Sequence, residues 1–77
     1  MRYVVANKEK ALDAGVLLLG HLVKGESIIL NEKEVMCLPS LDGELEDRIS
    51  LLDGIVYTNT NMNQIISEGG WEYGRKL

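Results

Sequence analysis

Residues 42–58 have the sequence DGELEDRISLLDGIVYT and carry the clearest structural pattern of the chain. Apolar side chains recur in this stretch at positions i, i+4 and i+7, the spacing that lines one face of an amphipathic helix. We therefore predict a helix over Glu44–Asp53, with Asp42 as its N-cap and Gly54 as its C-terminal stop. The residues of the apolar stripe are Leu45, Ile49 and Leu52.

The segment after this helix predicts a strand and then a last helix. Ile55–Thr58 is rich in β-branched and aromatic residues, which favour strands. The following helix has Thr60 or Asn61 as its cap, and Gly69–Gly70 ends it. Its apolar residues are Met62, Ile65 and Ile66.

The N-terminal part predicts a strand, a short helix and a second strand. Arg2–Ala6 has the composition of a strand, and Asn7 is suited to cap a helix over Lys8–Ala14 that Gly15 ends. Val16–Val23 is apolar on both alternating faces, which predicts a strand covered on both sides.

An alternative interpretation joins Lys8 to Lys24 in one helix that ends at Gly25. That helix would hold Gly15 and Gly20 in its interior, where each glycine costs about 1 kcal/mol relative to alanine. We therefore favour the short helix followed by a strand.

Lys24–Glu26 predicts a hairpin turn that leads into a strand over Ser27–Leu30. For residues 31–38, two interpretations stay open. Asn31 and Glu34 have the spacing of a capping box, which predicts a short helix over this segment. The alternative is a second hairpin that turns at Asn31–Glu32 and pairs Ile28–Leu30 with Val35–Cys37.

Together these elements predict an α/β (α+β) domain, in which a small single-layer β-sheet of about four strands packs with three to four short helices. We expect one domain over residues 1–70 and a C-terminal tail over residues 71–77. A chain of 77 residues buries only about 60% of its unfolded surface, and small domains commonly add a disulfide, a metal or a partner. One cysteine and one histidine supply neither an internal disulfide nor a four-ligand zinc site, so a homo-oligomer or a larger partner is expected.

The composition is that of an ordinary globular protein, with 45% hydrophobic and 26% charged residues. A net charge of −4 argues against direct nucleic-acid binding, which depends on lysine and arginine. The longest apolar run, Val16–Leu19, is far shorter than the roughly 20 residues of a membrane-spanning helix. No signal peptide is predicted either, so we expect a cytoplasmic protein without a membrane partner.

Two residues have side chains suited to catalysis, and both have simpler interpretations. His21 needs a carboxylate, cysteine or serine partner, and its apolar neighbours favour a packed, hydrogen-bonded residue in a strand. Cys37 lies among Val35, Met36 and Leu38, which favours a small buried hydrophobic residue over a nucleophile.

A cluster of acidic residues precedes and opens the predicted helix at residue 44. It lacks the spacing of a calcium loop, so a solvated helix start is favoured over a cation site or a mimic of phosphates. The cluster consists of Asp42, Glu44, Glu46 and Asp47.

The C-terminal segment carries the most suggestive binding residues. Aromatic and arginine side chains are enriched where proteins bind other molecules. Trp71 is expected to fold over the last helix, which would otherwise be left uncovered. Leu51 lies off the apolar stripe of its helix, so we expect it at a subunit interface. The candidate binding residues are Tyr57, Trp71, Tyr73 and Arg75.

We therefore expect a small non-enzymatic protein-binding or accessory module that works as a homo-oligomer, without metal or cofactor. One specific version is an inhibitor of a larger bacterial protein, which the sequence does not select. In size and mixed composition the chain resembles bacterial and phage accessory proteins, a general likeness that implies no residue or activity. The alternative is an oligomer that binds or sequesters a nucleotide between subunits through Tyr57, Trp71 and Arg75. A third hypothesis is a small enzyme that uses His21 with a carboxylate.

Overall fold

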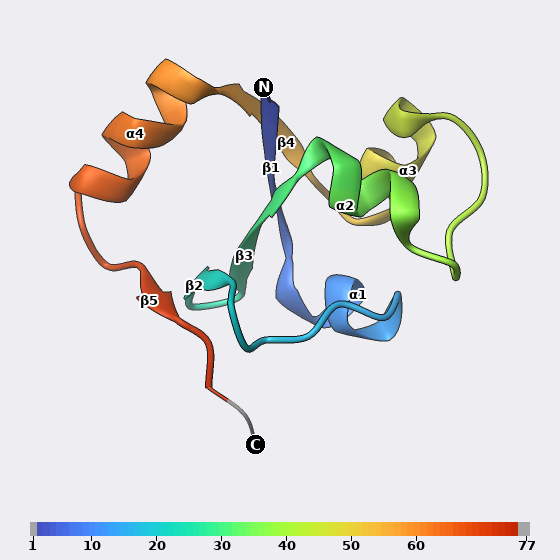
Figure 1. Cartoon of the computed structure of the whole chain (residues 1–77), viewed down its shortest axis with the longest axis horizontal. Helices are drawn as coiled ribbons and strands as arrows, with labels where there is room; N and C mark the ends of the chain where they lie inside the picture. The colour runs from blue at the N-terminus through green and yellow to red at the C-terminus, as the bar shows by residue number, and fades with distance from the viewer. Residues whose placement is uncertain (1, 76–77) are drawn as a thin grey trace.

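A computed structural model describes residues 2–75, which form one five-stranded antiparallel sheet and four helices (Figure 1). The strand order is β4-β1-β3-β2-β5, and every neighbouring pair is antiparallel. The predicted α+β class with a single-layer sheet is confirmed. The strands are β1 (Arg2–Asn7), β2 (Leu22–Lys24), β3 (Ser27–Asn31), β4 (Ile55–Thr58) and β5 (Glu72–Tyr73), and the helices are α1 (Lys8–Asp13), α2 (Glu32–Cys37), α3 (Leu45–Leu51) and α4 (Asn59–Ser67).

The main core lies between the central strand pair β1–β3 and three of the helices. Val4 pairs with Leu30 and Ala6 with Ile28, and all four side chains are buried on one face of the sheet. They pack in one cluster with residues of α1, α2 and α3, the helices that Figure 1 shows grouped on one side of the β1–β3 pair. The buried helix residues of this cluster are Ala11, Val35 and Ile49.

The opposite face of the sheet, here called the α4 face, is covered by α4. Side chains alternate along a strand, so Tyr3 of β1 and Ile29 of β3 point to this face. Met62 of α4 is only 1% exposed, and it lines the same cavity as these two residues. The chain therefore has a large core on one face and a small one on the other.

Polar caps fix the starts of three helices. Asn7 accepts a hydrogen bond from the Lys10 backbone N–H (3.0 Å), as predicted. Asn31 and Glu34 form both bonds of a capping box, so the helix interpretation of residues 31–38 is confirmed and the second hairpin is wrong. The last helix begins one residue after Thr58, which caps it in place of the predicted Thr60 or Asn61.

The predicted strand over Val16–Val23 is wrong, and so is the alternative helix that crosses it. Only Leu22–Lys24 forms a strand, because Gly15 and Gly20 both adopt positive φ angles (110° and 90°) that interrupt regular structure. The hairpin that follows is confirmed, since Lys24 pairs with Ser27 across a two-residue turn.

The loop before α3 also differs from the prediction. Glu44 occupies the N-cap position without a side-chain cap bond, and the helix starts at Leu45, so Asp42 is not the cap. Arg48 holds this loop instead: its guanidinium donates to the carbonyl oxygens of Gly43 (2.9 Å) and Leu38 (3.1 Å). The predicted stripe of α3 is confirmed, with Leu45 partly buried and Ile49 and Leu52 buried.

The segment expected to be a tail contributes to the sheet. Glu72 and Tyr73 form β5, which pairs with Val23 and Leu22 of β2 at one sheet edge. Gly74 donates its backbone N–H to the carbonyl of His21 (2.8 Å). Residues 76–77 lie outside the described residues.

Candidate functional site: a histidine–glutamate pair and a neutral sheet edge

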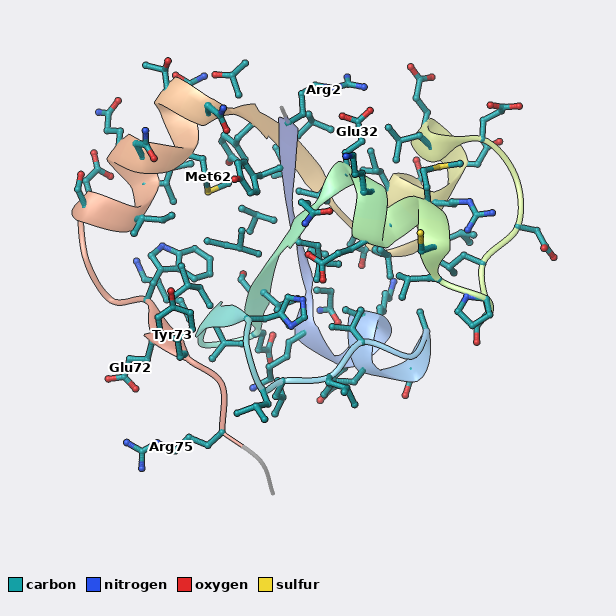
Figure 2. The ribbon with its side chains drawn as sticks, in the orientation of Figure 1. Arg2, Glu32, Met62, Glu72, Tyr73 and Arg75 are labelled. Atoms are coloured by element: carbon teal, nitrogen blue, oxygen red, sulfur yellow. The ribbon has the colours of Figure 1, made fainter. Side chains whose placement is uncertain are left out.

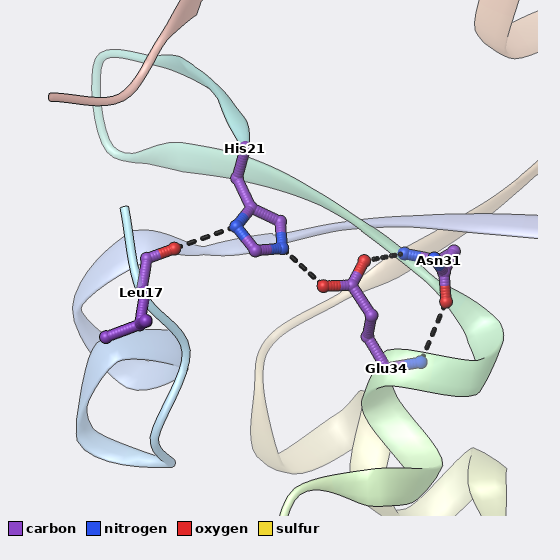
Figure 3. A network of polar contacts seen from close by, with 4 residues as sticks. All are labelled: Leu17, His21, Asn31 and Glu34. Atoms are coloured by element: carbon purple, nitrogen blue, oxygen red, sulfur yellow. Dashed lines mark hydrogen bonds and ion pairs between the residues drawn. The ribbon is translucent and has the colours of Figure 1, made fainter. Parts of the chain in front are cut away.

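The loop before β2 is tied to the start of α2 by one polar network (Figure 3). The Nε2 atom of His21 contacts the Glu34 carboxylate, and its Nδ1 atom lies 2.7 Å from the carbonyl oxygen of Leu17. The second carboxylate oxygen of Glu34 accepts from the Asn31 backbone N–H (3.0 Å), within the capping box. The predicted packed and hydrogen-bonded role of His21 is therefore confirmed, although the residue lies in a loop and not in a strand.

The network determines what His21 is able to do chemically. Both ring nitrogens of His21 face oxygen atoms, Nδ1 the carbonyl of Leu17 and Nε2 the carboxylate of Glu34. A general base needs a free ring nitrogen within reach of substrate. In this structure both ring nitrogens of His21 are engaged, and the carboxylate partner that the enzyme hypothesis requires is Glu34.

A second ion pair joins β1 to α2 at the surface. Arg2 binds Glu32 through Nε (3.1 Å) and Nη2 (2.8 Å), a bidentate contact in which Arg2 remains half exposed (Figure 2). The hydrogen bonds from the guanidinium, and secondarily its charge, lower the pKa of the Glu32 carboxyl below its ordinary value.

This shift predicts how the pair responds to acid. Because the pKa of Glu32 is lower in the folded state, the pair stabilises the fold above the unfolded-state pKa, and that contribution is lost as the pH falls through the folded-state pKa. Arg2→Met should raise the Glu32 pKa back toward its ordinary value in a carboxyl-detected NMR titration. Lys33→Met, which removes a neighbouring charge that does not contact Glu32, is the control. A Glu32 pKa that Arg2→Met leaves unchanged would contradict the assignment.

The predicted binding residues do not converge within one chain. Tyr57 lies on β4 at one edge of the sheet, while Tyr73 lies on β5 at the other, with Trp71 and Arg75 on either side of it (Figure 2). Four strand spacings separate the two edges, about 19 Å in all. A nucleotide held by Tyr57, Trp71 and Arg75 together would therefore need residues from two copies.

Leu51 has the exposure that the sequence predicts. It is 56% exposed at the end of α3, and Ile55 (60%) and Val56 (39%) of β4 follow it. β4 pairs with β1 only, so its outer edge is free in the described part of the chain. We call Leu51 and Ile55–Thr58 the β4 edge.

The β4 edge begins a long neutral segment. Residues 54–67 contain no aspartate, glutamate, lysine, arginine or histidine, although the chain as a whole carries 20 acidic and basic side chains and a net charge of −4. The sequence analysis identified Leu51 as an interface candidate but missed residues 54–67, although their lack of charged side chains can be read from the sequence.

The remaining candidates lie at the surface without converging. Cys37 is exposed at the end of α2, so its predicted burial is wrong. Val35 and Leu38 are buried, whereas Met36 and Cys37 face solvent. The acidic side chains around the start of α3 are all exposed. Among residues 2–75, no three histidine, cysteine or acidic side chains are grouped to hold a metal ion. The exposed acidic side chains around the start of α3 are those of Asp42, Glu44, Glu46 and Asp47.

None of the helices in the described range 2–75 has both the length and the apolar character needed to span a bilayer. Comparison of the chain with protein-family models, with curated proteins and with solved structures finds no match.

Proposed function

We propose that the protein is a small non-enzymatic protein-binding module that works as a homodimer joined through the β4 edge. The observation that carries the proposal is the character of β4, an outer strand with Ile55 60% exposed and Val56 39% exposed and with no charged residue. A strand of this kind presents unpaired backbone N–H and C=O groups to any second strand.

Proteins usually protect such an edge. The common devices are lysine or another charge on the strand, a proline, a β-bulge or a covering helix. The sequence of β4, Ile-Val-Tyr-Thr, contains neither charge nor proline, and its register against β1 is continuous from Ile55 to Thr58. An unprotected edge with two exposed apolar residues, Ile55 and Val56, supports its use in binding.

Charge favours a second copy as the occupant of this edge. Two copies that each carry a net charge of −4 repel one another over most of their surfaces. The repulsion is weakest where residues 54–67 face each other, because that segment is uncharged. The neutral edge is therefore where two acidic copies approach at the lowest electrostatic cost.

The strand also suits symmetric pairing. A two-fold axis perpendicular to the sheet at Val56 makes β4 antiparallel to its own copy and sets Ile55 of one copy opposite Tyr57 of the other. Both side chains then lie on the same face of a continuous ten-stranded sheet, where aromatic and β-branched residues pair favourably. The contact is closed, so it gives a dimer and not a filament.

The test is the mass in solution. Light scattering after gel filtration should give twice the 8.6 kDa chain mass at high micromolar concentration, and Val56→Lys should return the protein to a monomer, because it places a charge on the pairing edge.

Leu17→Lys is the matched control, because Leu17 is 73% exposed and lies in the loop before β2, away from the β4 edge. It should leave the dimer intact. A wild-type monomer throughout, or a dimer that Val56→Lys does not weaken, would overturn self-association. A monomer whose β4 edge captures a different protein would assign the edge to a foreign partner.

A further inference from the structure

A cavity of about 490 Å³ opens on the α4 face of the sheet. Its walls come from β1, β2 and β3 on one side and from α4 on the other, with β5 at its margin; Figure 2 labels Met62 and Tyr73 on these last two elements. Ligand pockets in proteins span about 300–1,000 Å³, so the cavity has room for a small molecule. The cavity lies on the α4 face, whereas the proposed dimer pairs through the backbone of the outer strand β4.

The floor of the cavity is apolar. Ile29 and Met62 are buried there, and Leu22 and Ile66 extend the apolar surface toward solvent. Tyr73, which is 70% exposed, stands at the margin. A thioether and a tyrosine ring both make favourable contacts with flat aromatic groups.

The rim carries polar groups that the fold leaves available. Asn31 uses its side-chain carbonyl oxygen to accept from the Glu34 backbone N–H, which leaves its NH₂ group for another acceptor. Tyr3 and Asn63 also line the cavity, and within residues 2–75 their side chains hydrogen-bond to no other protein group. The cavity thus offers donors and acceptors around a small apolar floor.

The side chains that line the cavity limit the charge of the ligand that it can bind. The side chains of His21 and Glu34 already contact each other, and no lysine or arginine of the described chain lines the cavity. A phosphate or carboxylate would lose its hydration there without gaining a cationic partner.

We infer that the cavity on the α4 face is a binding site for an uncharged, planar heterocycle of nucleobase or nucleoside size. The ring lies against Tyr73 and Ile66, above the buried Met62, and its polar edge bonds with the side chains of Asn31, Asn63 and Tyr3.

The experiment is an amide-detected NMR titration of the full chain with adenine and adenosine, and with AMP as the charged counterpart. Adenosine should shift the resonances of Leu22, Asn31 and Met62 with a dissociation constant of about 1 mM or below, the range set by the atom count of so small a ligand. AMP should bind at least about 3-fold more weakly, because its phosphate has no cation to meet.

Asn63→Ala should weaken adenosine binding about 3- to 10-fold by removing one rim hydrogen bond. Asn61→Ala is the matched control, since it removes the same side chain from an exposed position on the same helix outside the cavity. The site is contradicted if neither adenine nor adenosine shifts these resonances, or if Asn61→Ala and Asn63→Ala weaken binding equally. AMP binding more tightly than adenosine would contradict the uncharged ligand class.

Discussion

Gly54→Ala is expected to destabilise the protein by about 2–3 kcal/mol, a large share of the stability of so small a domain. A Cβ at this position would lie 2.6 Å from Cγ1 of Val4 and 3.2 Å from the carbonyl oxygen of Ile49. Val4 belongs to the central strand, and Ile49 is in the buried stripe of α3. The chain passes between Val4 and Ile49 where α3 leads into β4, so a Cβ at residue 54 would clash with both.

Urea unfolding of Gly54→Ala, Val4→Ala and the double variant measures this cost and its origin. Val4→Ala removes the methyl group nearest to the new Cβ, so the double variant should be less destabilised than the sum of the two single variants. Additive effects, or a Gly54→Ala protein as stable as the wild type, would show that the close approach does not constrain the fold.

Glu34→Ala is expected to lower the free energy of unfolding by about 2–3 kcal/mol, because the Glu34 side chain holds both the start of α2 and the loop that contains His21. Its carboxylate accepts from the Asn31 backbone N–H at the start of α2 and from the His21 ring. Removal leaves the His21 ring without its carboxylate partner and opens half of the capping box. The loop that contains Leu17 should then lose its attachment to α2.

Glu34→Gln separates the two roles. Glutamine completes a capping box as glutamate does, but it carries no charge for His21. Thermal unfolding should therefore place Glu34→Gln between the wild type and Glu34→Ala. In both variants, amide exchange at residues 17–21 should rise above that of the wild type. Equal stability of all three proteins, with unchanged exchange, would mean that the network does not hold the loop.

Local signals in the sequence predicted most of the fold correctly. Caps and turns depend on a few neighbouring residues, which is why Asn7, the capping box at Asn31 and the hairpin at Gly25 were all found. The apolar stripe of α3 was predicted for the same reason, since the helical spacing of its apolar residues is visible in the sequence. These elements need no knowledge of distant contacts.

Two local caps were misassigned, Asp42 before α3 and Thr60 or Asn61 before α4, and the other errors came where distant contacts decide the structure. The apolar run after Gly15 predicts a covered strand, yet Leu17 and Leu19 (62% exposed) face outward, and Leu19 forms an isolated bridge to Gly74. That bridge, like the pairing of β5 with β2, joins segments roughly fifty residues apart, which no local pattern encodes. Gly54 was interpreted as a helix stop, but its need for glycine comes from Val4, on another strand.

The candidate site residues also divide into those that a local pattern predicts and those that depend on distant contacts. The exposure of Leu51 follows from its place off the helical stripe and was predicted. The contact between His21 and Glu34 depends on how the loop folds onto α2, and it was not predicted. The same holds for Arg48, whose role is to hold backbone carbonyls of a loop that the sequence does not position.

Hydrogen exchange along β4 tests the proposed dimer most directly, because strand pairing protects backbone amides that a monomer leaves open to solvent. Amides of Ile55–Thr58 that do not bond to β1 should exchange more slowly as the protein concentration rises through the range in which the mass doubles. Those of Glu72 and Tyr73, at the opposite sheet edge, should not change. Exchange on β4 that is independent of concentration, in a protein that nevertheless dimerises, would show that the two copies meet elsewhere.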